Sequence, residues 1–197
     1  MSKLKEFHSV LAENGGAITA AQANKTGVSN ERLRLLVKSG QLNRAQFGVY
    51  VAADEFIDKM FIAQLRRPKM VYSHGTALFL HHLTDRDPLS YSVTVPTGYN
   101  PSNLQKDGFR VFNIKRDLHR IGLTKQKTIY GNPVWVYDME RTICDCLRSR
   151  NQLEPGLCSE ALKRYLTRKE KNLIDLSQMA DIFSVGKLLR TCLEVLL

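Results

Sequence analysis

The chain has 197 residues, enough for one large domain or two small ones. Apolar residues make up 43% of it and charged residues 24%, values typical of folded globular proteins, which argues against global disorder. Lysine and arginine outnumber aspartate and glutamate by 29 to 19, and the net charge of +10 favours a polyanionic partner, either nucleic acid or an anionic membrane surface.

Targeting and redox signals point to a cytoplasmic protein. No segment approaches the roughly 18 apolar residues of a membrane span, and residues 1–16 lack the continuous apolar stretch of a signal peptide. The cysteines crowd into the last third of the chain, unlike a disulfide framework, and lack the second pair or nearby histidine of a zinc site. We therefore expect reduced thiols and no metal or cofactor at Cys144, Cys146, Cys158 and Cys192.

The first 40 residues predict three helices with short connections. The first begins at Ser2 and ends near residues 14–16; its apolar stripe comprises Leu4, Phe7, Val10 and Leu11. Thr19 begins the second helix, with Gln22 three residues later as a capping box. Ser29 caps the third helix, which Gly40 ends.

The third helix has one apolar face and one basic face. At 100° per residue, Leu33, Leu36 and Val37 lie within about 100° of each other and form the predicted core face. Arg34 and Lys38 fall on the opposite side, together with Leu35, and Arg32 lies at the edge of that side. This arrangement is typical of a helix that lies in a DNA major groove, although a solvated charged face would show the same pattern.

A short hairpin follows the third helix. Its first strand begins at residues 41–42, residues 43–46 form the turn, and residues 47–51 return as the second strand. Arg44 would then lie at the tip, and Tyr50 would either bind phosphate or pack in the core. Three helices and a hairpin predict a winged helix-turn-helix DNA-binding domain over residues 1–53. Its candidate DNA-binding residues are Ser29, Asn30, Arg32, Arg34, Lys38, Arg44 and Tyr50.

Residues 54–197 predict a second domain with a small β-sheet followed by a helical bundle, so the whole chain is α+β. Expected helices cover residues 54–65, 73–84, 139–150, 154–168, 172–183 and 185–196, and expected strands cover 91–96, 108–114, 127–130 and 133–137. The last two strands would form a hairpin around Gly131 and Asn132, and Asp138 would cap the helix that follows. A candidate additional basic surface comprises Lys106, Arg110, Lys115, Arg116, Arg120, Lys125 and Lys127; a second basic stretch covers residues 163–171.

Two groups of residues suggest chemistry, and each has a plainer interpretation. Three carboxylates could bind Mg²⁺ in a nuclease, but capping and first-turn roles explain at least two of them; they are Asp138, Glu140 and Asp145. Three histidines invite a metal or acid–base interpretation, but no HExxH motif accompanies them, and core or surface roles are favoured; they are His74, His81 and His82.

Several motifs in order resemble one family. The runs "AITAAQANKTGVSNERLRLLVKSGQLNRAQFGVYVAAD", "YSHGTALFLHHLTD", "SVTVP" and "VYDMERTICDCLR" are similar to AbiEi-type antitoxins of type IV toxin–antitoxin systems, and the resemblance covers most of the chain. It implies a transcriptional repressor that binds inverted repeats in its own operon promoter, giving negative autoregulation. It also implies that residues 54–197 are an antitoxin domain that counteracts an AbiEii-type, nucleotidyltransferase-like toxin without a stable complex, as part of abortive infection and phage resistance.

The sequence thus favours a non-enzymatic antitoxin and autorepressor whose partner is double-stranded operator DNA, with no cofactor. One alternative is a metal-dependent nuclease targeted by the winged helix, which predicts Mg²⁺-dependent cleavage that is lost on substitution of Asp138 or Asp145. The other is a protein-interaction module, which predicts little dependence of binding on salt.

Overall fold

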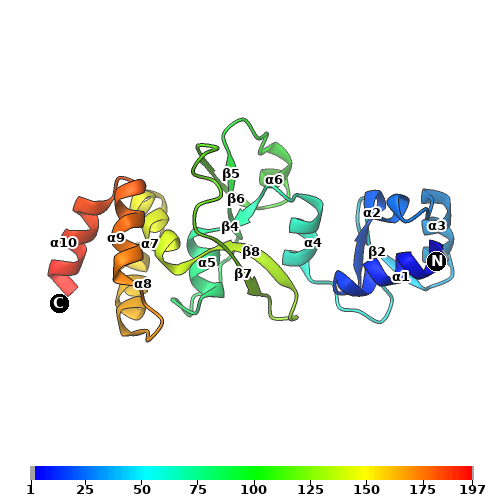
Figure 1. The fold of residues 1–197 in the computed structure, drawn as a ribbon, viewed down its shortest axis with the longest axis horizontal. Helices are drawn as coiled ribbons and strands as arrows, with labels where there is room; N and C mark the ends of the chain where they lie inside the picture. Colours follow the sequence, from blue (N-terminus) through cyan, green and yellow to red (C-terminus); the bar gives the residue numbers. More distant parts are fainter. Residues whose placement is uncertain (1–2, 197) are drawn as a thin grey trace. The chain divides into compact units, whose positions relative to one another are not determined.

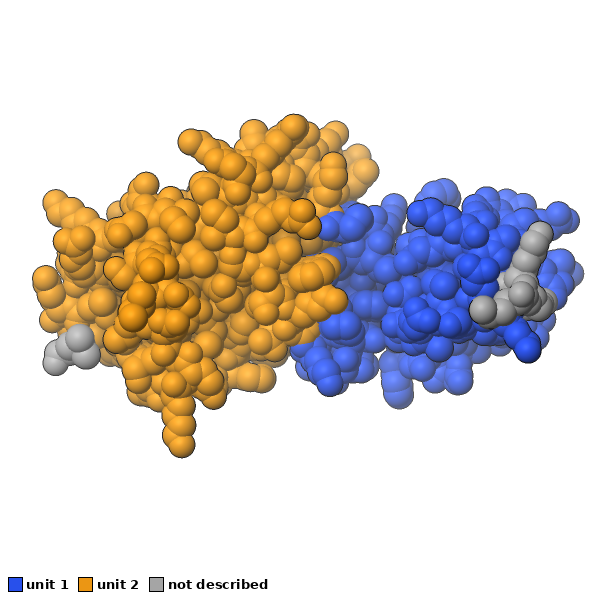
Figure 2. Space-filling view, viewed as in Figure 1, with its two compact units in different colours: residues 1–68, 127–134 blue, residues 69–126, 135–197 orange. Residues whose placement is uncertain are grey.

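The computed structural model describes residues 3–196, with side chains from residue 5 onward. Ser2 and the side chain of Leu4, assigned above to the first helix, lie outside the described residues. The protein is a mixed α+β structure with two separate sheets (Figure 1). It divides into two compact units (Figure 2): unit 1 comprises residues 1–68 and 127–134, and unit 2 comprises residues 69–126 and 135–197.

Unit 1 contains three helices and a small sheet, followed by one more helix. The elements are α1 (Lys3–Glu13), β1 (Ala17–Thr19), α2 (Ala20–Lys25), α3 (Asn30–Lys38), β2 (Leu42–Gln46), β3 (Val49–Ala52) and α4 (Lys59–Arg66). The three strands are antiparallel in the order β1-β3-β2. The sequence did not predict β1, because three residues carry no periodicity and its pairing with β3 joins positions about 30 residues apart.

The predicted helix caps of unit 1 are confirmed. The Thr19 hydroxyl accepts a hydrogen bond from the Gln22 backbone N–H at 3.1 Å, and the Gln22 side chain accepts one from the Thr19 N–H at 2.9 Å. The Ser29 hydroxyl accepts from the Arg32 N–H at 3.2 Å and starts α3. These side chains satisfy backbone donors that a helix start leaves without partners, so they fix where both helices begin.

The hairpin turn lies later in the chain than predicted. Residues 43–46, expected as the turn, belong to strand β2, and Phe47 and Gly48 form a two-residue connection. Gly48 adopts φ +74°, a left-handed conformation that favours glycine in tight hairpin turns. Arg44 consequently lies within β2, opposite Tyr50 of β3, and not at the tip.

Side chains on the two faces of β3 pack in two different small cores. Val49 and Val51 pack with Ala17 and with Ile62 of α4. Tyr50 points to the other side and joins a core built from the helices, whose main members are Phe7, Leu11, Ile18, Ala23, Leu33 and Leu36. Because α4 covers one face of the sheet, the compact unit continues past residue 53, and the predicted boundary between residues 53 and 54 falls inside it.

Helix α4 begins at Lys59 and not at Asp54 as predicted. One oxygen of the Asp58 carboxylate accepts from the N–H groups of Met60 and Phe61, both at 3.1 Å. Its other oxygen accepts from Thr128 and Asn132, in the chain segment that completes unit 1. The buried carboxylate thereby fixes the helix start and holds residues 127–134 within the same unit.

Unit 2 combines a five-stranded sheet with helices. Its elements are β4 (Val71–Tyr72), α5 (His74–Leu80), β5 (Ser92–Pro96), α6 (Ser102–Lys106), β6 (Arg110–Ile114), β7 (Leu123–Lys127), β8 (Pro133–Tyr137), α7 (Met139–Arg148), a 3₁₀ turn (Arg150–Gln152), α8 (Leu157–Thr167), α9 (Leu173–Ile182) and α10 (Gly186–Leu196). Lys127 and the first two residues of β8 belong to unit 1. The strand order is β6-β5-β4-β8-β7; β5 and β6 are parallel, as are β4 and β8.

Most predicted elements of unit 2 are present, with three differences. Strand β7 covers 123–127 instead of 127–130, so the connection to β8 is a five-residue loop and not a two-residue turn. Helix α5 ends at Leu80, because His82 adopts a left-handed φ of +56° that a helix cannot continue through. The short elements β4 and α6 were not predicted, since neither is long enough to show a period.

Helix α7 lies at the centre of the unit 2 core. Its side chains from Ile143 to Leu147 pack against α5, α8, α9 and α10, and every residue from Glu140 to Leu147 is buried. All four cysteines lie in the described residues and none is bridged. Burial raises the pKa of the Cys144 thiol to about 12, so this group stays protonated and unreactive at neutral pH.

Within residues 3–196, no helix is both long enough and apolar enough to cross a membrane.

The capping box of α2 makes a measurable contribution to stability. Thr19→Ala removes the acceptor for the Gln22 N–H, and we expect the free energy of unfolding to fall by about 1 kcal/mol. Thr19→Ser keeps the hydroxyl and should remain close to the wild type. Urea denaturation followed by circular dichroism measures both variants; equal stability of the alanine variant and the wild type would contradict this role.

Candidate nucleic-acid interface

Helix α3 presents its basic side chains to solvent because its other side is buried. Leu33 is fully buried and Leu36 nearly so, both within the core of unit 1. The basic side chains of the opposite side are exposed, as predicted; they are Arg32, Arg34 and Lys38. Among the residues that the structure describes, none of these three forms an ion pair. Their charges are therefore available to an external anion.

A shallow hollow lies along this side of the helix. It is lined by Arg32, Leu35, Leu36, Lys38, Ser39 and Gln41. Leu35 is 51% exposed, an apolar side chain on the same exposed side as the basic residues. This face is complementary to a DNA major groove. Guanidinium and ammonium groups bind phosphates and guanine edges, and an apolar side chain contacts thymine methyls.

The start of α3 contributes two further predicted residues, both exposed. The Ser29 hydroxyl already accepts the Arg32 N–H as the helix cap. Asn30 accepts a long hydrogen bond of 3.4 Å from the Asn24 side chain of α2, which links the exposed ends of the two helices. Both side chains keep hydrogen-bonding capacity toward solvent.

The structure changes the interpretation of the two hairpin residues. Tyr50 is only 8% exposed and packs in the helical core, so it is a core residue and not the phosphate contact proposed as one alternative. Arg44 is exposed on β2, and its guanidinium carbon lies 5.3 Å from the ring centre of Phe47. Phe47 itself, which the sequence indicated only as a strand residue, is 76% exposed.

The predicted additional basic residues are divided between the two edges of the five-stranded sheet and the segments near them. Lys106 ends α6, Arg110 begins β6, and Lys125 lies on β7. Strands β6 and β7 are the two opposite edges of the five-stranded sheet, four strand spacings or about 19 Å apart. The positions just after β6 include Lys115 and Arg116, whereas Arg120 lies in the loop before β7 and Lys127 belongs to unit 1.

The second basic stretch, residues 163–171, is partly engaged within unit 2. Arg164 forms ion pairs with Asp85 and Glu160. Arg168 donates to the backbone carbonyls of His81 and His82 at 3.0 and 2.8 Å. These two arginines therefore connect the segment after α5 to α8 and to the residue that follows α8.

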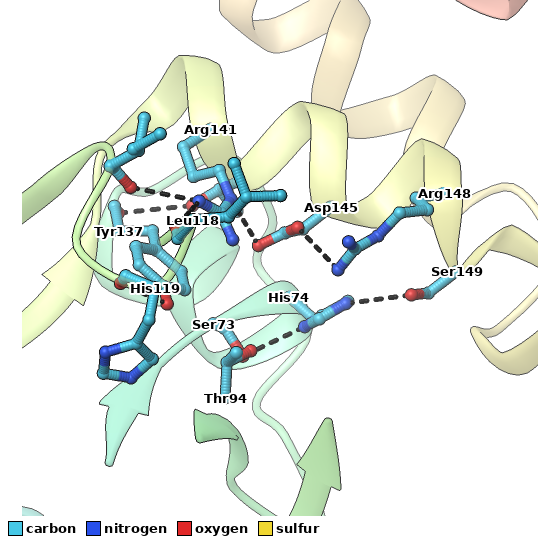
Figure 3. A network of polar contacts seen from close by, with 12 residues as sticks. Ser73, His74, Thr94, Leu118, His119, Tyr137, Arg141, Asp145, Arg148 and Ser149 are labelled. Atoms are coloured by element: carbon cyan, nitrogen blue, oxygen red, sulfur yellow. Dashed lines mark hydrogen bonds and ion pairs between the residues drawn. The ribbon is translucent and has the colours of Figure 1, made fainter. Parts of the chain in front are cut away.

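The three carboxylates considered for a nuclease each have a structural partner. Asp138 caps α7 by accepting the Arg141 N–H at 2.8 Å, and Glu140 accepts the Tyr165 hydroxyl at 2.6 Å. Asp145 is fully buried between Arg141 and Arg148, at 2.9 and 3.1 Å (Figure 3). Within the described part of the chain, no group of three or more histidine, cysteine, aspartate or glutamate side chains could hold a metal ion.

Arg141 lies at the centre of a network of buried polar contacts in unit 2. The sequence analysis did not identify it as a candidate functional residue. Its Nη1 donates to the carbonyls of Leu118 and Ile121 at 3.0 and 3.1 Å, and its Nε donates to Asp145. The guanidinium lies between the rings of Tyr137 and Phe183, 4.2 and 3.7 Å from their centres. The only local signal was the i, i+4 spacing of Arg141 and Asp145.

The histidines are interior or surface groups and do not come together. His74 is fully buried, stacked on Phe112 at 3.6 Å and hydrogen-bonded to the hydroxyls of Ser73 and Ser149 (Figure 3). His81 donates to the Tyr137 carbonyl at 2.7 Å, and His82 is exposed. Because Ser73 and His74 are both fully buried, no substrate reaches this serine–histidine pair in the structure.

Burial lowers the pKa of His74 well below its usual value, and the nearby charges of Arg148, Arg141 and Arg110 lower it further. Burial also lowers the pKa of His81. Both imidazoles are therefore neutral in the folded protein at neutral pH.

Comparison with known proteins supports the fold of the chain. No protein-family model and no curated protein matches it. Its fold is similar to the crystal structure of the RV2827C protein from Mycobacterium tuberculosis, with a TM-score of 0.54 and 11% sequence identity. The match covers 94% of this chain and 78% of that chain. At this identity the similarity supports the overall α+β fold alone.

The buried histidines predict that the protein loses stability in mild acid. The unfolded chain binds protons as the pH falls through about 6.5, whereas folded His74 resists protonation until well below that value. The stability that each such histidine contributes is therefore complete above pH 6.5 and decreases on acidification, by up to about 1.4 kcal/mol per pH unit. Urea denaturation at about pH 7.5, 6.5 and 5.5 measures this slope.

A substitution at His74 tests whether this imidazole causes the change of unfolding free energy with pH. His74→Gln retains hydrogen bonding to Ser73 and Ser149 without a titrating group, so its slope should be shallower than that of the wild type. The control is the exposed His82→Asn, because asparagine tolerates the left-handed backbone at that position. A slope unchanged by His74→Gln would show that this imidazole is not responsible.

Proposed function

We propose that residues 1–53 form a winged helix-turn-helix that binds double-stranded operator DNA, with α3 as the recognition helix. The observation that carries the proposal is the exposed basic side of α3, which lacks ion pairs within the described residues while Leu33 and Leu36 anchor the other side. The order of helices and strands supports it: α2 and α3 are joined by a short turn, and the β2–β3 hairpin follows as the wing.

In this proposal the exposed side chains of α3 contact different parts of the DNA. The basic side chains meet phosphates or guanine edges in the major groove, and Leu35 contacts a thymine methyl. These basic side chains are Arg32, Arg34 and Lys38. Ser29 and Asn30, at the helix start, face the sugar-phosphate backbone. The exposed side chain of Arg44 on β2 adds a positive charge to the wing. The net charge of +10 increases the rate at which the protein encounters DNA.

We propose further that the protein is an antitoxin and transcriptional autorepressor. The support is the resemblance to AbiEi-type antitoxins in the motifs of both units. On this basis the operator consists of inverted repeats in the promoter of its own operon. The C-terminal domain counteracts a nucleotidyltransferase-like toxin without a stable complex, in a system that gives phage resistance by abortive infection.

DNA recognition by α3 predicts weaker binding on removal of its basic side chains. Arg34→Ala and Lys38→Ala should each weaken binding to the upstream DNA of the operon about tenfold, and removing one phosphate interaction should make the log–log salt slope shallower by about one. Fluorescence anisotropy at about 50 and 200 mM salt measures both effects. Lys59→Ala is the matched control, since it removes an exposed lysine from α4 of the same unit.

The same measurements separate the alternatives. Unchanged affinity in both α3 variants would refute this recognition helix. Binding that hardly depends on salt would favour a protein-interaction module. Cleavage of the DNA that requires Mg²⁺ and disappears in Asp138→Ala would favour the nuclease.

The autorepressor and antitoxin activities should separate in the full-length chain. A double variant, Arg34→Ala with Lys38→Ala, should lose repression of a promoter reporter yet still restore the growth of cells that express the toxin. Loss of both activities in this variant, with the protein folded, would contradict a toxin-neutralising role that resides in the C-terminal domain.

A further inference from the structure

We propose that Phe47, at the turn of the β2–β3 hairpin, enters the minor groove of the bound DNA as an apolar wedge and bends the duplex. This inference rests on the proposed DNA-binding function and assigns a role to a residue that is absent from the candidates predicted from sequence. It concerns one exposed aromatic side chain and the cation beside it.

The first observation is the exposure of Phe47 on a turn held in place from both sides. The side chain is 76% exposed, whereas the side chains of β3 directly after the turn are buried. Gln46 and Val49 pair across the turn, and the Gly48 carbonyl accepts a hydrogen bond from the Ala20 N–H at 2.8 Å. A tight, anchored turn presents the ring in a defined position, which reduces the entropy lost when it contacts a partner.

The second observation is the chemistry of the neighbouring side chain. The Arg44 guanidinium lies 5.3 Å from the centre of the Phe47 ring, and within residues 5–196 Arg44 forms no ion pair. Many proteins that bind the minor groove use arginine, which is attracted by the negative potential of the groove. Many of them also insert an apolar side chain between base steps. The hairpin carries both groups side by side.

The third observation is the position of the turn. The hydrogen bond from Ala20 places it at the first residue of α2, the helix that precedes α3. In a helix-turn-helix complex this preceding helix crosses the DNA backbone while the next helix lies in the major groove. A side chain on the turn beside the start of α2 is therefore placed near the backbone that borders the adjacent minor groove.

A wedge at this place predicts a sequence preference outside the bases that α3 contacts. Inserting a ring unstacks one base step, and pyrimidine–purine steps such as TA and CA unstack most easily. The flank of each half-site should therefore favour such a step. The preference arises from the deformability of the DNA and not from hydrogen bonds to base edges.

The test uses the full-length protein, its own upstream DNA and a matched pair of substitutions. Phe47→Ala removes the wedge, and Phe56→Ala removes a phenylalanine of similar exposure, 78%, that lies before α4 in the same unit. Energy transfer between dyes at the two ends of the duplex measures bending, and anisotropy measures affinity. We expect Phe47→Ala to abolish the bend and to weaken binding about tenfold, whereas Phe56→Ala and the apolar variant Phe47→Leu should retain most of both.

The outcomes distinguish this inference from the proposed function. If the wild-type protein binds its upstream DNA no better than a scrambled duplex, the proposed function fails. If the wild type binds specifically but Phe47→Ala binds and bends equally well, the wedge is refuted and DNA recognition by α3 stands. Weaker binding without any change in bending, or an equal effect of Phe56→Ala, also refutes the wedge.

Discussion

The burial of one side of α3 is the constraint on which the candidate interface depends. Leu33 and Leu36 pack with Phe7 of α1 and Ile18 of β1, and Tyr50 of β3 closes the same core. Exposing these side chains to water would cost about 1.5–3 kcal/mol each, so α3 cannot rotate about its axis without losing the core. The basic side chains face solvent as a consequence of this packing, and the side of the helix that carries them is therefore fixed by the core.

Local signals were sufficient to predict most helices and the orientation of α3. The caps at Thr19, Ser29 and Asp138 are bonds between residues three apart, and the structure contains each of them. The strands β1 and β4 escaped prediction because their short sequences acquire a strand conformation only by pairing with distant segments. The turn of the hairpin was misplaced because residues 47–51 were assigned together to the second strand, whereas the left-handed φ of Gly48 forms part of the turn itself.

Site residues were harder to predict than elements, since their roles depend on neighbours from elsewhere in the chain. Tyr50 could not be told from a phosphate contact until β3 was placed against the helices. Asp145 resembled a metal ligand in the sequence, but Arg141 and Arg148 enclose it in the core. The basic residues from 106 to 127 looked continuous along the chain, yet the sheet separates Arg110 and Lys125 to opposite edges.

The central claim is that this chain recognises a defined DNA sequence through α3. DNase I footprinting of the full-length protein over the entire region upstream of its gene tests it most directly, with the Arg34→Ala variant run alongside. We expect one discrete protected segment containing inverted repeats, which disappears in the variant at the same protein concentration. Uniform protection along the fragment, or a footprint that Arg34→Ala leaves intact, would contradict it.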